Sequence, residues 1–198
     1  MKLTIDQFVA NPPSAWAGLA PWQATTQAMD ILAKLVENAG ADFNIGNGCA
    51  IHKTANVEPG AVLKGPVYVG ANCMVAHGAY LRGGVWLQGD AIIGPNCEVK
   101  TCFTFTGSKV AHLSFVGDSI LGHGVNVEAG AMIANYRNEK ADKMITFQFE
   151  GSRVDTGVDK FGCLLGDNSR VGANAVVAPG AMFRPSTIIK RLQLVDLA

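Results

Sequence analysis

The chain has 198 residues, 48% of them hydrophobic and 16% charged, which predicts a globular fold and excludes a disordered polyampholyte. Sixteen basic side chains balance sixteen acidic ones, so the composition argues against nucleic-acid binding. The N-terminus has no apolar stretch of signal-peptide length, and no segment has the roughly 20 apolar residues of a membrane span. We therefore expect a cytoplasmic protein without a membrane partner.

Residues 1–40 predict an N-terminal helical cap. Pro21 stands near a helix start, Gly40 follows the helix, and apolar residues recur between them at helical spacing. This pattern predicts a helix from about Trp22 to Asn38. We expect the helix to cover the first coil of the repeat that follows, because an uncapped end would expose core and strand edges.

From residue 41 onward the chain predicts a repeat of six residues. Every sixth residue from Ile45 to Phe105 is apolar, and the residue four positions further along each unit is mostly small. The same register returns at Leu121 and again at Leu165. A period of six fits neither an amphipathic helix nor an alternating strand, but it fits a solenoid of short strands and turns.

This hexapeptide pattern resembles the left-handed parallel β-helix of the hexapeptide-repeat transferases. The resemblance runs from about Ile45 to Arg191 and implies an all-β fold over residues 41–198, with the N-terminal helical cap in addition. Cys49, Cys73 and Cys97 fall on the small inward position, so we expect buried thiols rather than catalytic ones. Five cysteines without a Cys-x-x-Cys pair also argue against a disulfide framework or a zinc ribbon.

Two interruptions of the period predict loop insertions, near residues 106–120 and 136–162. The second is expected to include a projecting hairpin. Both are richer in polar groups than the coils, and a regular solenoid needs no insertions for its stability. They are therefore candidates for functional segments.

The segment AHLSFVGDSILGHGVNVEAGAMIANY resembles the acetyltransferase half of bacterial and archaeal bifunctional sugar-1-phosphate nucleotidylyltransferase/acetyltransferases. The resemblance implies an acyltransferase that uses acetyl-CoA to acetylate the amine of an amino sugar phosphate or a sugar nucleotide. It also implies a homotrimer, because the family's sites form between neighbouring β-helices. We expect no nucleotidylyltransferase domain, since residues 1–40 are too few to hold the nucleotide-binding sheet.

The resemblance assigns roles to individual residues. The family's general base falls on His112, and its asparagines that orient acceptor and acyl donor fall on Asn126 and Asn135. The arginine and lysine that bind the sugar phosphate fall on Arg82 and Lys100. Histidine suits the role of base because its pKa lies near neutrality, and cations suit the binding of a phosphate. Two further lysines, Lys140 and Lys143, resemble a pair that contacts substrate in the archaeal members.

The donor side is implied in the same way. The turn at Ala129 and Gly130 is expected to border the coenzyme A channel, where a backbone N–H or an asparagine amide supplies the oxyanion donor. Lys190 and Arg191 are the cations expected to meet a coenzyme phosphate.

Two residues depart from the family pattern. Phe115 stands where the better-known members have a tyrosine close to the acceptor, so one hydroxyl is missing, and a changed acceptor or weaker catalysis is expected. Glu128 replaces a glycine of the family and places a carboxylate beside the expected coenzyme channel.

Other functions stay open at this point. One is acylation of a hydroxyl, as in the sugar O-acyltransferases of the same superfamily, and another is a non-catalytic trimer that binds a sugar nucleotide or a partner protein. A zinc site built from His52, His77 and His123 would resemble the hexapeptide-repeat carbonic anhydrases, but the ligand pattern of that family is not matched. We expect no metal.

Overall fold

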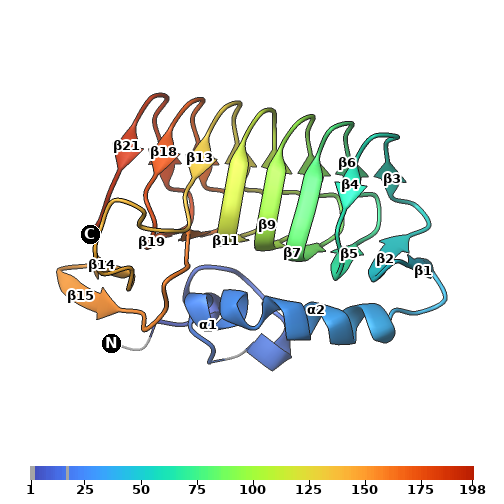
Figure 1. Ribbon diagram of the computed structural model, residues 1–198, viewed down its shortest axis with the longest axis horizontal. Coiled ribbons are helices and arrows are strands. Elements are labelled where there is room, and N and C mark those ends of the chain that lie inside the picture. Colours follow the sequence, from blue (N-terminus) through green and yellow to red (C-terminus); the bar gives the residue numbers. More distant parts are fainter. Residues whose placement is uncertain (1–2, 17) are drawn as a thin grey trace.

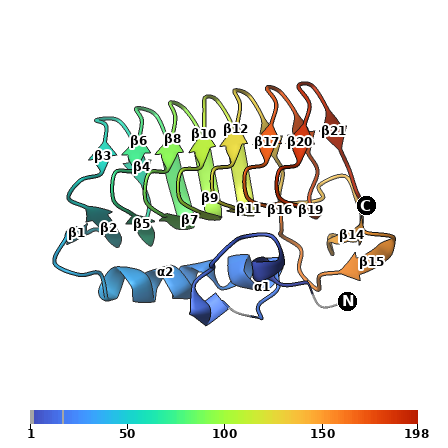
Figure 2. The same ribbon diagram turned by 180° about the vertical axis from the view of Figure 1, so that it is seen from behind.

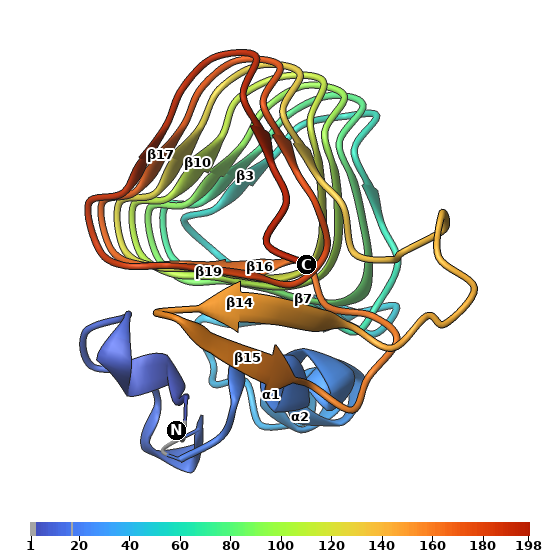
Figure 3. The same ribbon diagram turned by 90° about the vertical axis from the view of Figure 1, so that its left-hand side faces the viewer.

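The structure is a computed structural model that describes residues 3–16 and 18–198. Its body is a β-helix of stacked triangular coils, flanked on one side by two helices and a hairpin (Figures 1 and 3). Viewed from its C-terminal end in Figure 3, the chain turns clockwise as it approaches the reader, so the β-helix is left-handed. The predicted fold class is confirmed.

Each coil contributes a short parallel strand to three faces, which we name by what lies on them. The open face consists of β4 (Val62–Leu63), the first halves of β7 (Tyr80–Leu87), β9 (Glu98–Thr104) and β11 (Phe115–Leu121), then β13 (Met132–Ile133), β18 (Val176–Val177) and β21 (Leu194–Val195). The covered face consists of β2 (Cys49–His52), β5 (Val67–Val69), the second halves of β7, β9 and β11, then β16 (Cys163–Leu165) and β19 (Ala181–Phe183).

The third face, which we call the groove face, is turned toward the viewer in Figure 2, which shows the molecule from behind. It consists of β3 (Asn56–Val57), β6 (Met74–Val75), β8 (Ile92–Ile93), β10 (Lys109–Val110), β12 (Asn126–Val127), β17 (Arg170–Val171) and β20 (Ile188–Ile189). At the N-terminal end of the β-helix, β1 (Phe43–Gly46) pairs antiparallel with β2.

The inward residues form a dry aliphatic core, as the period predicts. Cys49, Cys73 and Cys97 are buried in it with free thiols, which confirms their structural interpretation. Burial raises the pKa of the Cys73 thiol to about 11, so this side chain stays a neutral thiol at physiological pH.

The loop insertion predicted near residues 106–120 is wrong. Strands β10 and β11 continue the coil there, and Thr104, not Phe105, takes the inward position between Leu87 and Leu121. The register slips because the corner before Thr104 is one residue shorter than the corner of β7, with Thr101 in the left-handed region at φ +55°. Phe105 points outward instead, with its ring centroid 5.2 Å from that of Trp86.

This register has a testable consequence at Thr104. The buried Thr104 hydroxyl has no hydrogen-bond partner among the described residues, because its neighbours in the stack are leucines. We expect Thr104→Val to raise the free energy of unfolding by about 1 kcal/mol, because the variant removes an unsatisfied polar group without changing the shape. Urea unfolding measures it. Thr156→Val is the control and should lower the free energy of unfolding, because the Thr156 hydroxyl donates to the Ile145 carbonyl at 2.7 Å. A destabilised Thr104→Val would contradict this register.

The N-terminal helix is present but lies elsewhere than predicted. It is split at Gln27 into α1 (Pro21–Thr26) and α2 (Ala28–Glu37), preceded by short 3₁₀ turns at Ile5–Gln7 and Ser14–Trp16. Both helices run beside the covered face, along the axis of the β-helix, rather than closing the first coil (Figure 1). Helix α1 contacts β9 and β11, and α2 contacts β5, β7 and β9. Among the described residues no helix has the length and apolarity to cross a bilayer.

The helices pack on the side because the covered face has a second apolar surface. The middle residue of its strands points outward and is apolar, as in Trp86, Phe103, Ile120, Leu164 and Met182. Together with N-terminal residues and the insert these side chains form a second core. Burial of this surface outweighs any gain from covering the end of the coil.

The second interruption contains an antiparallel hairpin, β14 (Thr146–Phe149) and β15 (Ser152–Asp155). Its entry is anchored by Arg137, whose buried guanidinium donates to both Asp196 carboxylate oxygens at 2.9 and 2.7 Å and to the Pro179 carbonyl at 2.7 Å. The insert is thereby tied to the C-terminal coil.

This anchor predicts an acid-sensitive contribution to stability. Arg137 holds the pKa of Asp196 below its usual value, so the contribution is present above the unfolded pKa and is lost as the pH falls through the folded one. Asp196 is partly exposed, so we expect Asp196→Asn to lower the free energy of unfolding at pH 7 by about 2 kcal/mol. At pH 2 the difference from wild type should shrink. Urea unfolding at both values tests this, with Glu139→Gln, on the exposed side of Arg137, as control. An equal loss at both pH values would contradict the charge pair as its cause.

Candidate active site

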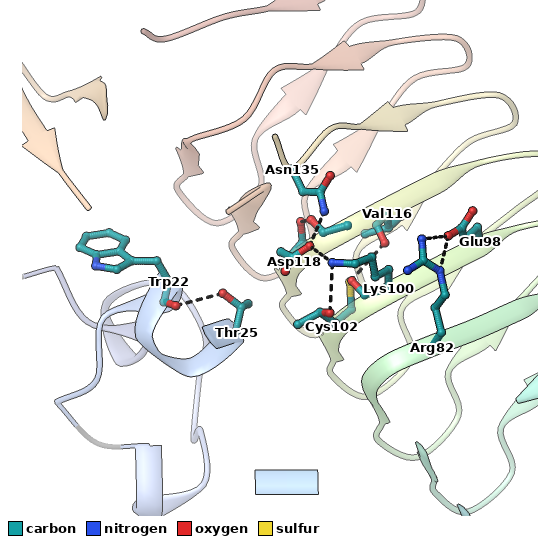
Figure 4. Close-up of polar contacts among 12 residues, drawn as sticks. Trp22, Thr25, Arg82, Glu98, Lys100, Cys102, Val116, Asp118 and Asn135 are labelled. Atoms are coloured by element: carbon teal, nitrogen blue, oxygen red, sulfur yellow. Dashed lines mark hydrogen bonds and ion pairs between the residues drawn. The ribbon is translucent and has the colours of Figure 1, made fainter. Parts of the chain in front are cut away.

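The open face brings together three of the residues singled out in the sequence. Arg82 and Lys100 are register partners on β7 and β9, and Asn135 follows β13 (Figure 4). The Lys100 ammonium lies 2.7 Å from Asp118 Oδ2, and Asn135 Nδ2 donates to the same oxygen. Two side chains from different coils therefore converge on one carboxylate.

Asp118, which joins these side chains, is the residue of the candidate site that the sequence analysis missed. It sits at the corner of β11 with φ +43° and is only 6% exposed, and its own carbonyl accepts the Gly162 N–H at 2.9 Å. A lone carboxylate inside an apolar strand was the available signal, because a buried charge requires partners.

Both candidate phosphate-binding cations are ion-paired. Arg82 Nε and one terminal nitrogen reach Glu98 Oε1 at 2.7 and 2.6 Å, and Lys100 pairs with Asp118. The four charges cancel, so the site has no net positive charge. Arg82 nevertheless keeps further N–H donors, because a guanidinium has five. The two pairs fix the positions of both cations at this corner of the open face.

Phe115 lies beside this cluster. A Cβ on Gly117 would come within 2.8 Å of Phe115 Cζ and 2.7 Å of Asn135 Cγ. The glycine at this position therefore leaves room for a phenyl ring and an amide side by side over the strand.

His112 lies at the opposite edge of the open face, at the corner that joins it to the groove face. Its carbonyl accepts the Gly130 N–H at 2.8 Å and the Ser114 hydroxyl at 3.0 Å, which fixes the backbone. The imidazole is exposed and has no hydrogen-bond partner within residues 3–16 and 18–198. A ring held at a rigid corner but free at both nitrogens is available to accept a proton.

Asn126 is not brought to the cluster within one chain. It belongs to the groove face, in register with Lys109 and Arg170. This face carries a groove of about 680 Å³ that is lined by Lys109, Asn126, Glu128, Arg170, Lys190 and Arg191.

Glu128 forms an ion pair with Arg191, one of the cations of this groove. Arg191 donates to both Glu128 oxygens at 2.9 Å, and the Ala173 N–H reaches Oε2 at 2.9 Å. Pairing with Arg191 lowers the pKa of Glu128. Lys109, Arg170 and Lys190 have no carboxylate partner in the part of the chain that the structure describes.

Two of the residues implied by the family have other partners. The Lys143 ammonium donates to the carbonyls of Arg137, Asn138 and Lys140, and these bonds use all three of its N–H groups. Lys143 therefore stabilises the insert in this structure, whereas Lys140 is exposed. The Gly130 N–H is donated to His112, so it is not available to an oxyanion.

The histidines weighed for zinc lie at separate turns with different partners. His52 contacts Thr54, His77 contacts the Pro59 carbonyl, and His123 contacts the Ala10 carbonyl. Among the described residues no three histidine, cysteine or acidic side chains gather as metal ligands would.

Comparisons with known proteins give sequence relatives. No family model matches the chain. It is 36% identical over 100 residues to a bifunctional sugar-1-phosphate nucleotidylyltransferase/acetyltransferase of Sulfurisphaera tokodaii, covering 48% of this chain and 24% of the relative. It is 36% identical over 148 residues to the bifunctional protein GlmU of Chromobacterium violaceum, covering 74% of this chain and 23% of the relative. The chain thus spans about a quarter of the length of these relatives.

Among solved structures, a variant of AntD, an N-acyltransferase from Bacillus cereus in complex with dTDP and coenzyme A, aligns with a TM-score of 0.47 and 13% identity, covering 70% of this chain and 74% of that one. The sequence relatives match the family inferred from the motif around His112. The chain is a left-handed β-helix that resembles the acetyltransferase region of the bifunctional sugar-1-phosphate nucleotidylyltransferase/acetyltransferases, as its sequence predicts.

Proposed function

We propose that the protein is an acetyl-CoA-dependent N-acetyltransferase that acts on an amino sugar phosphate or a sugar nucleotide. The observation that carries the proposal is the placement of His112 across the open face from Arg82, Lys100 and Asn135. A free imidazole and a set of phosphate donors thus share one face, in the spacing that the relatives' motif implies.

The chemistry follows from these positions. The acceptor amine attacks the thioester carbonyl while His112 takes its proton, a C–N bond forms and the C–S bond breaks. His112 then returns the proton to the leaving thiolate. Asn135 uses its Nδ2 toward Asp118, so its Oδ1 is free to accept a hydrogen bond from the acceptor on the side of the phosphate-binding cations. The Ala129 N–H, without a partner among the described residues, is the candidate oxyanion donor.

The groove fits the donor. It is lined by three cations that have no carboxylate partner within residues 3–16 and 18–198, and the phosphates of coenzyme A require cationic partners. Lys109, Arg170 and Lys190 can bind these phosphates without breaking an ion pair seen among the described residues. Arg191 must first release Glu128.

Glu128 therefore weakens donor binding. We expect Glu128→Gln to lower the KM for acetyl-CoA roughly threefold to tenfold, since the variant keeps the contact to the Ala173 N–H but frees Arg191. Glu58→Gln is a matched control, because Glu58 accepts the His77 N–H at 2.7 Å from the corresponding turn of an earlier coil. Steady-state kinetics measures the effect, and an unchanged KM would show that Arg191 does not contact the donor.

We also propose a homotrimer. Asn126 lies on a different face from Lys100 and Asn135, so a site that contains all three requires the groove face of one copy against the open face of the next. Val62, Met132, Val176 and Leu194 are exposed on the open face and would be covered by such packing. Light scattering should give three times the 20.8 kDa of one chain.

Thiol release from acetyl-CoA tests the proposed function. The acceptor panel contains glucosamine-1-phosphate, galactosamine-1-phosphate and UDP- and dTDP-linked amino sugars. The proposal expects turnover on at least one amine and none on the matching hydroxyl sugars. Turnover on hydroxyl sugars would favour an O-acyltransferase, and binding without turnover in a folded trimer would favour a non-catalytic role.

A further inference from the structure

A second cavity adjoins the open-face cluster and has no role in the reaction as described so far. It measures about 430 Å³ and lies where α1 and α2, the corner of the β-helix and the exit of the insert meet. Its polar lining includes Thr25, Thr26, Thr101, Asp118 and Lys160. Figure 4 shows Thr25 on α1 facing the corner that carries Asp118 and Cys102.

The cavity lies beyond the phosphate-binding cations as seen from His112. Strand β11 begins beside the His112 corner and turns at Asp118, so the width of the open face separates the base from the cavity. Lys100 connects the two regions, with its ammonium 2.7 Å from Asp118 Oδ2 and 3.5 Å from the Thr101 hydroxyl. An acceptor with its amine at His112 and its phosphate at Lys100 therefore has this cavity on the far side of its phosphate.

Two consecutive glycines form the corner next to the cavity, and the first of them, Gly83, lines it. A Cβ on Gly84 would lie 3.0 Å from the Ala28 carbonyl carbon, so this glycine lets α2 pack directly on the corner. A Cβ on Gly83 would lie 2.8 Å from the Thr101 hydroxyl. Gly83 has φ +71° and Gly84 has φ +87°, in the left-handed region that favours glycine. The helical segment is thus fitted to the corner.

The lining is mixed in chemistry. Met29, Met144 and Val158 add apolar surface to the hydroxyl, carboxylate and ammonium groups. Such a lining suits a flat base together with a hydroxylated ribose, and the volume lies in the range of small-molecule pockets. The Thr26 hydroxyl donates to the Trp22 carbonyl at 2.8 Å, so its oxygen remains free to accept a hydrogen bond from a ligand.

We infer that this cavity holds the nucleoside of a sugar nucleotide, so that the acceptor is a nucleoside-diphosphate amino sugar rather than a sugar 1-phosphate. The inference rests on the proposed function and extends it. A sugar 1-phosphate ends at Arg82 and Lys100 and leaves the cavity empty. A sugar nucleotide continues past its phosphates into the space between the β-helix and α1.

The test fills the cavity from its exposed rim. Met29→Trp places an indole in it from α2, where Met29 is 49% exposed, so the fold should tolerate the change. Asp30→Trp is the matched control, because Asp30 is also exposed on α2 but does not line the cavity. Calorimetry measures binding of UDP, dTDP and GDP to the full-length chain and both variants. Kinetics compares the amino sugar nucleotides with glucosamine-1-phosphate.

We expect a nucleoside diphosphate to bind the wild type and Asp30→Trp, and to bind Met29→Trp at least tenfold more weakly. The kcat/KM for amino sugar nucleotides should exceed that for glucosamine-1-phosphate and should fall only in Met29→Trp. Binding of no nucleoside diphosphate, or equal binding by the two variants, would overturn the inference. Turnover of glucosamine-1-phosphate alone would overturn it and leave the proposed function standing. Nucleotide binding without any acetyl transfer would instead overturn the proposed function and support the cavity assignment.

Discussion

His112→Ala should lower kcat for acetyl transfer by about 10²- to 10⁴-fold, the range that a positioned general base contributes. Stability should be unchanged, because the imidazole is exposed and makes no hydrogen bond among the described residues. The contacts at this residue run through its carbonyl, which accepts from Gly130 and Ser114, and the alanine variant keeps them. The loss is therefore expected in the chemical step alone.

His77→Ala is the matched control for this variant. His77 occupies the same turn position in an earlier coil, but its Nδ1 contacts the Pro59 carbonyl at 2.7 Å. Steady-state kinetics and thermal unfolding are measured on both variants. Full activity in His112→Ala, or an equal loss in His77→Ala, would show that His112 is not the base.

Asp118→Asn should cause the second large loss. The variant leaves the Lys100 ammonium, whose side chain is 18% exposed, without its carboxylate, at a cost of about 3 kcal/mol in the free energy of unfolding. An amide is a weaker acceptor than a carboxylate and turns an NH2 group toward one of the two donors, so Lys100 and Asn135 are held less firmly and we expect the KM for the acceptor to rise at least tenfold. Asp118 acts here as a positioning residue through these two neighbours.

A double variant separates the positioning role of Asp118 from its contribution to the free energy of unfolding. Asp118→Asn combined with Lys100→Met removes both charges, so it should regain most of the lost stability while acceptor binding stays weak. Arg153→Gln is the control for an exposed pair with Asp155, and it should change stability by about 1 kcal/mol or less. Additive stability losses at Asp118 and Lys100 would contradict the ion pair as the cause.

The period of six predicted the β-helix because every coil imposes the same inward aliphatic residue. The first break was misread because Phe105 is apolar, like an inward residue, and only the shortened corner at Thr101 shows that Thr104 replaces it. Apolar type alone does not distinguish the inner core from the outer one. The outward row that includes Trp86 and Phe103 would have indicated the second core and the lateral position of the helices.

The site was predictable where residues separated by one coil in the sequence lie next to each other in the stacked coils. Arg82 and Lys100 are register partners in neighbouring coils, so their spacing from His112 carried over into space. Asp118 was missed because its importance depends on the side chains that reach it from other coils. The three carbonyl partners of Lys143 within the insert were likewise not predictable, because the sequence shows the residue type and not its partners.

The most direct test of the central claim is the identity of the acetylated atom. Wild-type protein and His112→Ala are incubated with acetyl-CoA carrying a ¹³C-labelled acetyl group and the amino sugar nucleotides, and the products are analysed by mass spectrometry before and after hydroxylamine treatment. The account predicts label in an amide, which hydroxylamine does not cleave, and its absence with His112→Ala. Label in a hydroxylamine-sensitive ester, or amide formation that persists without His112, would contradict it.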